Sequence, residues 1–260
     1  MHRFVRIVSL TVTLLLAAGC ASTPEDPTKN WSAQRLYSEG KEALTKGNYA
    51  NAIKHFESLE ARYPYGAYSE QAQLEVAYAY YKDQEMASAI AAAERFIRLH
   101  PTHQNVDYAY YLKGLASIDE ERNFLEAFLS DIDLSDRDPK ALRMAYDTFR
   151  ELLRRFPNSK YAEDSRLRMA YLVNALAKGE IHVANYYFKR GAYVAVVNRC
   201  KEVIERYQGT TAVEDALGIQ AKAYKKMGLE QLMNDSLRVL QTNFPNSKYL
   251  KEVAALPAKG

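Results

Sequence analysis

Small residues recur along the chain at a constant interval. Gly40, Ala77 and Gly114 are 37 positions apart, and the same interval separates Ala184 from Ala221. Self-similarity with a period between about 20 and 50 residues is typical of stacked helical repeats. The pattern therefore predicts an all-α chain in which similar helical units follow one another.

A second recurring position marks a second helix within each unit. It is occupied by Ala52, Ala89, Ala145, Val196 and Met233. Large apolar residues follow four and seven positions later, such as Phe56 and Leu59, and this spacing places them on one helical face. Proline lacks an N–H group and disfavours αR in the preceding residue, so we expect it to end this helix in four units. The unit ends are Tyr63-Pro64, His100-Pro101, Phe156-Pro157 and Phe244-Pro245, with Tyr207-Gln208 in the remaining unit.

The two-helix unit resembles the tetratricopeptide repeat, although it is about three residues longer than the usual 34. We place the extra residues in the loop after the proline. A single helix pair cannot bury its apolar face, whereas stacked pairs bury a continuous core. The predicted fold is therefore a superhelical array of five tetratricopeptide-like helix pairs.

Two departures from the period divide this array. About 19 extra residues separate the two helices of repeat three, around residues 122–138. About 14 extra residues, close to four helical turns, precede the first helix of repeat four, and this stretch contains no proline. We therefore predict one long helix over about 159–190, with Gly179 as a candidate kink. The resulting parts are repeats one to three (32–157), the long helix with repeats four and five (158–250), and a disordered tail (251–260).

Local signals predict two helix starts. Thr211 and Glu214 have the spacing of a capping box and would open the first helix of repeat five. Asp138 before Pro139 has the pattern of an N-cap followed by a proline at the first helical position.

Residues 1–19 have the pattern of a signal peptide. Arg3 and Arg6 precede an apolar stretch, residues 7–18, which is too short to span a bilayer. The end of this segment, LAAGC, resembles a bacterial lipobox, which implies that Cys20 is acylated and becomes the mature N-terminus. Ala21 after this cysteine implies the outer membrane rather than the inner membrane. Residues 20–31 would then form a lipidated tether; the alternative is an ordinary secretory leader with a cysteine by chance.

The remaining chemistry gives no catalytic pattern. The net charge is +3, which favours no nucleic-acid partner, and no nucleotide-binding, hydrolase or zinc motif occurs. Aspartates at 131, 133, 136 and 138 have the spacing of a calcium loop in part, but the glycine and glutamate that an EF-hand requires are missing. Cys200 lies in an apolar helical run and is interpreted as a buried structural thiol rather than a reactive one. We expect a protein that is not an enzyme and has no metal or other cofactor.

The first helices of tetratricopeptide arrays line a concave groove. The equivalent positions in the early repeats are Tyr37, Tyr78, Tyr81, Tyr108 and Tyr111, and those in the later repeats are Lys189, Lys222, Lys225 and Lys226. Tyrosines offer rigid contact area with a polar tip, which suits peptide binding, and lysines suit an acidic partner. The alternative is that the tyrosines pack between repeats and the lysines are only solvated.

Several longer runs are more specific than the repeat pattern. They are RYPYGAYSEQAQLEVAYAYYK (62–82), RFIRLHPTH (95–103), SDRDP (135–139), FPNSKY (156–161) and RGAYVAVVNR (190–199). With the lipobox and the repeats, they resemble the BamD family, the lipoproteins of the outer-membrane β-barrel assembly machinery. The longer 122–134 loop and Cys200 depart from that family's pattern.

This resemblance implies a lipid-anchored scaffold on the periplasmic face of the outer membrane. Its C-terminal repeats would dock on a periplasmic domain of the barrel-forming subunit, with Arg199 in the contact. Its N-terminal repeats would help to recognise unfolded outer-membrane proteins through Tyr63 and Tyr65, and other assembly lipoproteins would be further partners. For Arg199, the alternative is a surface arginine that covers Tyr193. For the whole protein, the alternatives are a lipid-anchored adaptor of cell-division or peptidoglycan machinery and, from another class, an enzyme with an unrecognised site.

Overall fold

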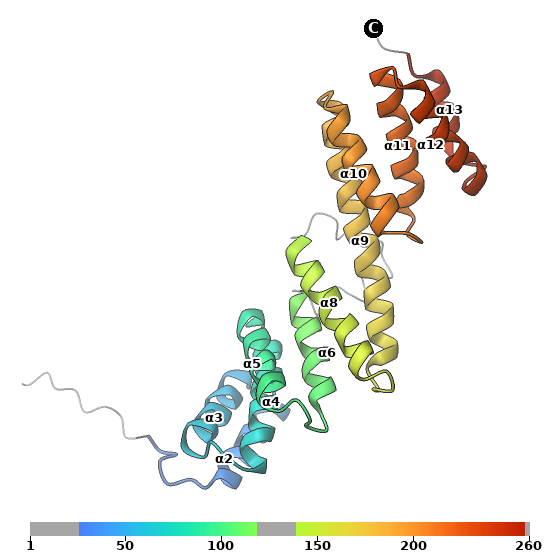
Figure 1. Cartoon of the computed structure of the whole chain (residues 1–260). Helices are drawn as coiled ribbons and strands as arrows, with labels where there is room; N and C mark the ends of the chain where they lie inside the picture. Colours follow the sequence, from blue (N-terminus) through green and yellow to red (C-terminus); the bar gives the residue numbers. More distant parts are fainter. Residues whose placement is uncertain (1–25, 119–138, 258–260) are drawn as a thin grey trace, which may run out of the picture.

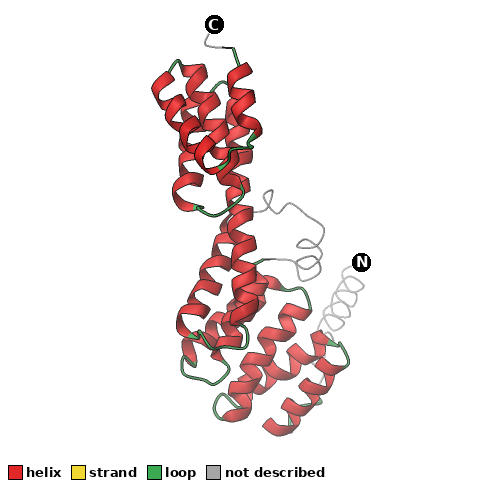
Figure 2. Cartoon of the chain, turned by 90° about the vertical axis from the view of Figure 1, so that its right-hand side faces the viewer, coloured by secondary structure: helices red, strands yellow, loops and turns green. Residues whose placement is uncertain are grey.

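The computed structural model describes residues 26–118 and 139–257 of the chain. Within these ranges all regular elements are helices, and they form an elongated array (Figures 1 and 2). The signal peptide, Cys20, the 122–134 loop and the aspartates at 131–138 lie outside the described residues. The helices in chain order are α2 (Ala33–Thr45), α3 (Tyr49–Arg62), α4 (Ala67–Lys82), α5 (Met86–Leu99), α6 (Val106–Ser117), α8 (Pro139–Arg155), α9 (Ala162–Lys189), α10 (Tyr193–Arg206), α11 (Ala212–Met227), α12 (Glu230–Asn243) and α13 (Lys248–Ala255).

Consecutive helices pack against one another along the whole array. The pairs are α2 with α3, α4 with α5, α6 with α8, α9 with α10, and α11 with α12. The prediction of an all-α array of helix pairs is confirmed.

The recurring small residues allow the two helices of a pair to approach closely. A Cβ atom on Gly40 would lie 2.6 Å from the nearest ring carbon of Phe56 in the partner helix. Gly114 has the same relation to Phe149, also at 2.6 Å. Both phenylalanines are fully buried. At Gly40 and Gly114, the period read from the sequence therefore corresponds to the same contact between a small residue and an aromatic ring.

Helix α9 joins the two halves of the array. It contains 28 residues, runs through Gly179 without a break, and matches the long helix predicted over 159–190. Its N-terminal part lies beside α8 and its C-terminal part beside α10 and α11 (Figure 1). One continuous helix therefore packs against the preceding helix pair through α8 and also forms the next pair with α10.

Three expectations about helix ends and chain ends are corrected. The capping box at Thr211 is wrong, because this residue has helical dihedrals (φ −63°, ψ −24°) and its side chain makes no capping hydrogen bond. The prediction of a disordered tail is wrong for residues 251–255, because they belong to α13, in which Val253 is only 1% exposed. The expectation of a tether over residues 20–31 is wrong around Thr28, which is 6% exposed and contacts repeat one. Asp138 lies outside the described residues, and α8 begins at Pro139.

Candidate binding surfaces

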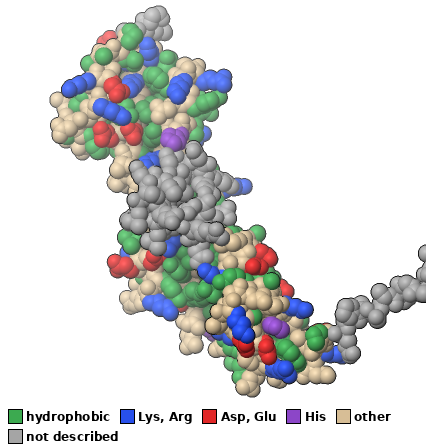
Figure 3. Space-filling view, turned by 180° about the vertical axis from the view of Figure 1, so that it is seen from behind, with side chains coloured by type: hydrophobic (Ala, Val, Ile, Leu, Met, Phe, Trp, Pro, Cys, Tyr) green, Lys and Arg blue, Asp and Glu red, His purple; other side chains and the backbone are tan. Residues whose placement is uncertain are grey.

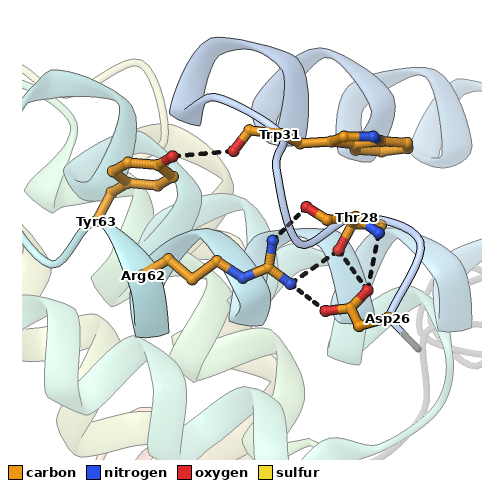
Figure 4. Close-up of polar contacts among 5 residues, drawn as sticks. All are labelled: Asp26, Thr28, Trp31, Arg62 and Tyr63. Atoms are coloured by element: carbon orange, nitrogen blue, oxygen red, sulfur yellow. Dashed lines mark hydrogen bonds and ion pairs between the residues drawn. The ribbon is translucent and has the colours of Figure 1, made fainter. Parts of the chain in front are cut away.

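The loop between α3 and α4, residues 63–66, carries two exposed tyrosines. Tyr63 is 38% exposed and Tyr65 is 91% exposed, the highest value among the exposed large hydrophobic residues of the described chain. Gly66 follows with a φ of +99°, which glycine adopts readily, and the chain then enters α4. The hydroxyl of Tyr63 donates a hydrogen bond to the carbonyl oxygen of Trp31 at 2.9 Å (Figure 4). This Tyr65 loop therefore contains one anchored and one projecting tyrosine.

Tyr68 extends this aromatic surface onto α4. Its side chain is 39% exposed, and its ring centroid lies 5.5 Å from that of Tyr37 in α2. Tyr37 also contacts the buried ring of Phe56, and burial together with the nearby Glu75 carboxylate raises its pKa. Tyr68 was not expected at this surface, although it is the third aromatic residue of the run YPYGAY.

The other predicted groove tyrosines are less accessible. Tyr81 is 4% exposed and belongs to the core of the first two repeats, so the expectation that it lines an open groove is corrected. Tyr78 is partly buried and packs against the same core. Tyr108 is partly buried as well, and its ring lies 5.4 Å from that of Tyr161. Desolvation raises the pKa of the Tyr108 hydroxyl.

Tyr111 joins α6 to the start of α9. Its ring is stacked on Tyr161 with centroids 4.5 Å apart, and its hydroxyl donates to Asp164 at 2.8 Å. Burial first, and then the hydrogen bond to Asp164, raise the pKa of Tyr111 to about 12. Ser159 in the preceding loop donates to Asp107 of α6 at 2.6 Å. Tyr111 therefore packs between repeats, which is the alternative that the sequence left open.

Three of the predicted docking lysines contact α13 or the residues that follow it. Lys222 forms an ion pair with Glu252, and the ammonium group of Lys225 donates to the carbonyl oxygens of Val253 at 2.6 Å and Ala254 at 3.1 Å. Lys226 donates to the carbonyl oxygen of Pro257 at 3.3 Å. Cationic groups are favourable at a helix C-terminus, where carbonyl groups lack helical partners.

These lysines therefore hold the C-terminal helix of their own chain rather than forming an open basic surface. Lys189, by contrast, is exposed at the end of α9. Lys and Arg side chains are interspersed with Asp and Glu on the face seen in Figure 3. The described residues on that face therefore form no large patch of a single charge sign.

Arg199 lies on α10 and is paired with α9. Its guanidinium group donates to Glu180 at 2.9 Å, and Arg143 of α8 lies 3.8 Å from the same carboxylate. The Glu180 side chain is 14% exposed, whereas that of Arg199 is 44% exposed. Arg199 also borders a surface hollow with Tyr187. Glu180 was not selected from the sequence, because a lone glutamate in a long helix carries no distinguishing signal there.

The described residues include no group of three or more His, Cys, Asp or Glu side chains placed to bind a metal ion. Cys200 is fully buried, as expected, and burial raises the pKa of its thiol to about 12. None of the described helices combines the length and hydropathy needed to cross a membrane.

Comparison with known proteins decides the family. Residues 29–240 match the family described as YfiO, outer membrane lipoprotein. The chain belongs to this family. The "Outer membrane protein assembly factor BamD" of Neisseria gonorrhoeae is 50% identical over 252 residues, which cover 96% of this chain and 94% of the relative.

More distant relatives carry the same name. The "Outer membrane protein assembly factor BamD" of Vibrio cholerae is 41% identical over 89% of this chain and 95% of the relative. Among solved structures, the crystal structure of MamA covers 88% of this chain and 98% of its own, but its 16% identity and TM-score of 0.34 carry no argument. The resemblance to the BamD family that was inferred from the sequence is confirmed.

Proposed function

We propose that this protein is a lipid-anchored scaffold of the outer-membrane β-barrel assembly complex. The observation that carries the proposal is the near full-length match to assembly factors, with 50% identity over 96% of the chain. The protein would be acylated at Cys20 and lie on the periplasmic face of the outer membrane. It would dock on the barrel-forming subunit, contact other assembly lipoproteins and bind unfolded outer-membrane proteins. Its role is binding rather than catalysis.

The Tyr65 loop would receive the substrate segment. Tyr65 projects into solvent, and Tyr63 and Tyr68 beside it are each more than a third exposed. Aromatic rings pair favourably with other aromatic rings in offset or edge-to-face geometry, at roughly 0.5–1.5 kcal/mol beyond the area they bury. An aromatic-rich strand end of an unfolded barrel protein is therefore a suitable ligand. Tyr37 supports Tyr68 from behind, while the buried Tyr81 contributes only to the shape of the repeat.

Arg199 would contact an acidic group on the barrel-forming subunit. Its guanidinium group presents five donors, and Glu180 orients it through one of them while the side chain stays 44% exposed. Arginine suits such contacts because its planar fork can bind a second carboxylate. Lys222, Lys225 and Lys226 would contribute to docking indirectly, by fixing α13 on the last repeat.

The test is affinity purification of tagged full-length protein from envelope membranes, with mass spectrometry of the bound proteins. We expect a near-stoichiometric outer-membrane barrel protein in the parent sample and its loss in Arg199→Leu. Arg206→Leu on the same helix is the matched control, because Arg206 pairs with Glu202 one turn away on its own helix, at 3.1 Å. Cell-wall or division proteins in place of a barrel protein would overturn the proposal and favour the adaptor alternative.

Substrate binding is tested with the same protein in detergent and a labelled peptide from the C-terminal strand of a barrel protein. Tyr65→Ala should weaken binding at least several-fold without lowering the melting temperature, because the side chain is 91% exposed. Tyr186→Ala is the control, since Tyr186 is an exposed tyrosine of α9 in the other half of the array. Equal affinity of Tyr65→Ala and the parent would place the peptide site elsewhere.

A further inference from the structure

A polar cluster attaches the chain before α2 to the end of α3. Its members are Asp26, Thr28 and Arg62, which we call the N-terminal lock. Arg62 forms an ion pair with the Asp26 carboxylate and donates to the carbonyl oxygen of Thr28 and, at 2.8 Å, to its hydroxyl (Figure 4). The amide and the hydroxyl of Thr28 donate to the second Asp26 oxygen at 2.9 and 2.8 Å. Both oxygens of the Asp26 carboxylate, and the amide, hydroxyl and carbonyl groups of Thr28, are thus bonded to another member of the lock.

Three further contacts hold the same segment. Tyr63 donates to the Trp31 carbonyl oxygen at 2.9 Å. The indole of Trp31 is stacked on His55 of α3 with ring centroids 5.6 Å apart, and the Arg35 guanidinium lies 4.2 Å from the indole centroid. The segment 26–31 is therefore attached to repeat one through Asp26, Thr28 and Trp31, while Pro27, Lys29 and Asn30 stay exposed. Its composition, with Pro27 and several polar residues, had indicated a free linker.

The lock changes the length of chain that is free to act as a tether. Six residue steps separate Cys20 from Asp26, and twelve separate Cys20 from Ser32 at the start of α2. A fully extended chain spans about 3.3–3.6 Å per residue, so the maximum reach is about 20 Å with the lock closed and about 40 Å without it. The lock therefore halves the distance that repeat one can move from an anchor at Cys20.

We propose that the N-terminal lock holds the Tyr65 loop beside the bilayer surface. The inference rests on the lipid anchor at Cys20 in the proposed function. Arg62 and Tyr63 attach the segment, and Tyr65 follows them directly in the same loop. Arg62, which holds the anchored segment by polar contacts, and the projecting Tyr65 are therefore only three residue steps apart. A membrane surface within about 20 Å of Asp26 is also close to this loop.

The chemistry of the lock suits a permanent attachment. Hydrogen bonds from Thr28, together with the charge of Arg62, lower the pKa of the Asp26 carboxyl. The ion pair therefore stays charged at neutral and mildly acidic pH. Thr28 is buried, which protects the hydrogen bonds at the centre of the cluster from competition with water.

The experiment measures how far repeat one lies from a membrane. Full-length acylated protein carrying Ala67→Cys is labelled with a fluorescent donor and reconstituted into phospholipid vesicles that contain an acceptor on the headgroups. Ala67 is the exposed first residue of α4, and the buried Cys200 leaves labelling selective. Arg62→Ala should reduce energy transfer by increasing the mean distance, by up to about 20 Å, the difference between the two reaches.

Two variants act as controls for the lock itself. Arg206→Ala removes the equivalent last residue of another 14-residue helix, α10, whose side chain pairs with Glu202 of the same helix. We expect energy transfer equal to that of the parent. A six-residue Gly-Ser insertion between residues 24 and 25 lengthens the tether without opening the lock, and it should reduce energy transfer as Arg62→Ala does.

Asp26→Ala provides a second test that leaves α3 intact. It should reduce energy transfer in the same direction, while circular dichroism confirms that the helices of both variants remain folded. Parent-like transfer in Asp26→Ala and Arg62→Ala, in protein that floats with the vesicles, would overturn the inference but leave the proposed function standing. Failure of the parent protein itself to float with vesicles would refute the lipid anchor and the inference together.

Discussion

Replacing Gly218 with alanine tests how α13 is held on the last repeat. Gly218 lies in α11, opposite the ring of Tyr249 in α13. An added Cβ would lie 2.0 Å from the Tyr249 Cγ and 2.5 Å from both Cδ atoms, so the ring must move. The Tyr249 hydroxyl donates to Asp215 at 2.7 Å, and displacement of the ring also breaks this hydrogen bond. The added methyl group therefore disturbs both the packing of the Tyr249 ring on α11 and its hydrogen bond to Asp215.

The magnitude follows from three opposing contributions to the docking free energy. Inserting a methyl group into a well-packed contact costs about 1–3 kcal/mol. Loss of a hydrogen bond to a carboxylate costs about 1.5–3 kcal/mol. Alanine in place of glycine in a helix returns about 1 kcal/mol. The net cost is at least about 1.5 kcal/mol, which lowers the ratio of docked to undocked α13 by a factor of about 10 or more.

The expected consequence is local. Helix α13 contains eight residues, too few to be stable in isolation, so once undocked it should unfold. Hydrogen exchange followed by mass spectrometry should show faster exchange in residues 248–257, and trypsin should cleave more rapidly after Lys248 and Lys251. The main thermal transition should change little, because α11 and α12 still pack against each other.

The decisive control is the same substitution in a Tyr249→Ala background. There the ring that meets the new methyl group is absent, so Gly218→Ala should instead stabilise the protein by about 1 kcal/mol through helix propensity. A change of sign between the two backgrounds is specific to the Gly218–Tyr249 contact. Unchanged exchange and proteolysis of residues 248–257 in Gly218→Ala would refute the reasoning.

Three further predictions concern single side chains. Cys200 should react with thiol reagents at pH 8 far more slowly in native protein than in urea, because its thiol is buried and its pKa is raised to about 12; equal rates would show that it is accessible. Tyr111→Phe keeps the ring stacked on Tyr161 but removes the bond to Asp164, so urea unfolding should show a loss of about 1–3 kcal/mol, and no loss would contradict that role. Burial raises the pKa of Glu60, so the folded state binds its proton more strongly than the unfolded state, and the stability difference between the parent and Glu60→Gln should shift in favour of the parent as the pH falls from 7 towards 4.5; a pH-independent difference in urea titrations would contradict this.

The sequence by itself determined the elements of this protein. Gly40 and Gly114 mark first helices because an aromatic side chain of the partner helix needs the space of a missing Cβ. The 28-residue α9 followed from an interval without proline, and the buried Cys200 from its apolar neighbours. These features are encoded locally, in residues a few positions apart on one helix face or at a helix end. Runs within 62–82 and 190–199 were specific enough to indicate the family.

Only the tertiary structure decided which polar side chains are available. The lysines of α11 were expected to face a partner, but α13 folds back so that Lys225 meets a carbonyl group of α13 and Lys226 meets that of Pro257 just after it. Likewise, Arg62 reaches a segment more than 30 residues away, which turned an expected linker into part of repeat one. Such pairs form where helix ends and chain ends meet in space, and a long charged side chain can be satisfied by many partners. Periodicity fixes which face of a helix is buried, whereas the choice among polar partners depends on how the helices stack.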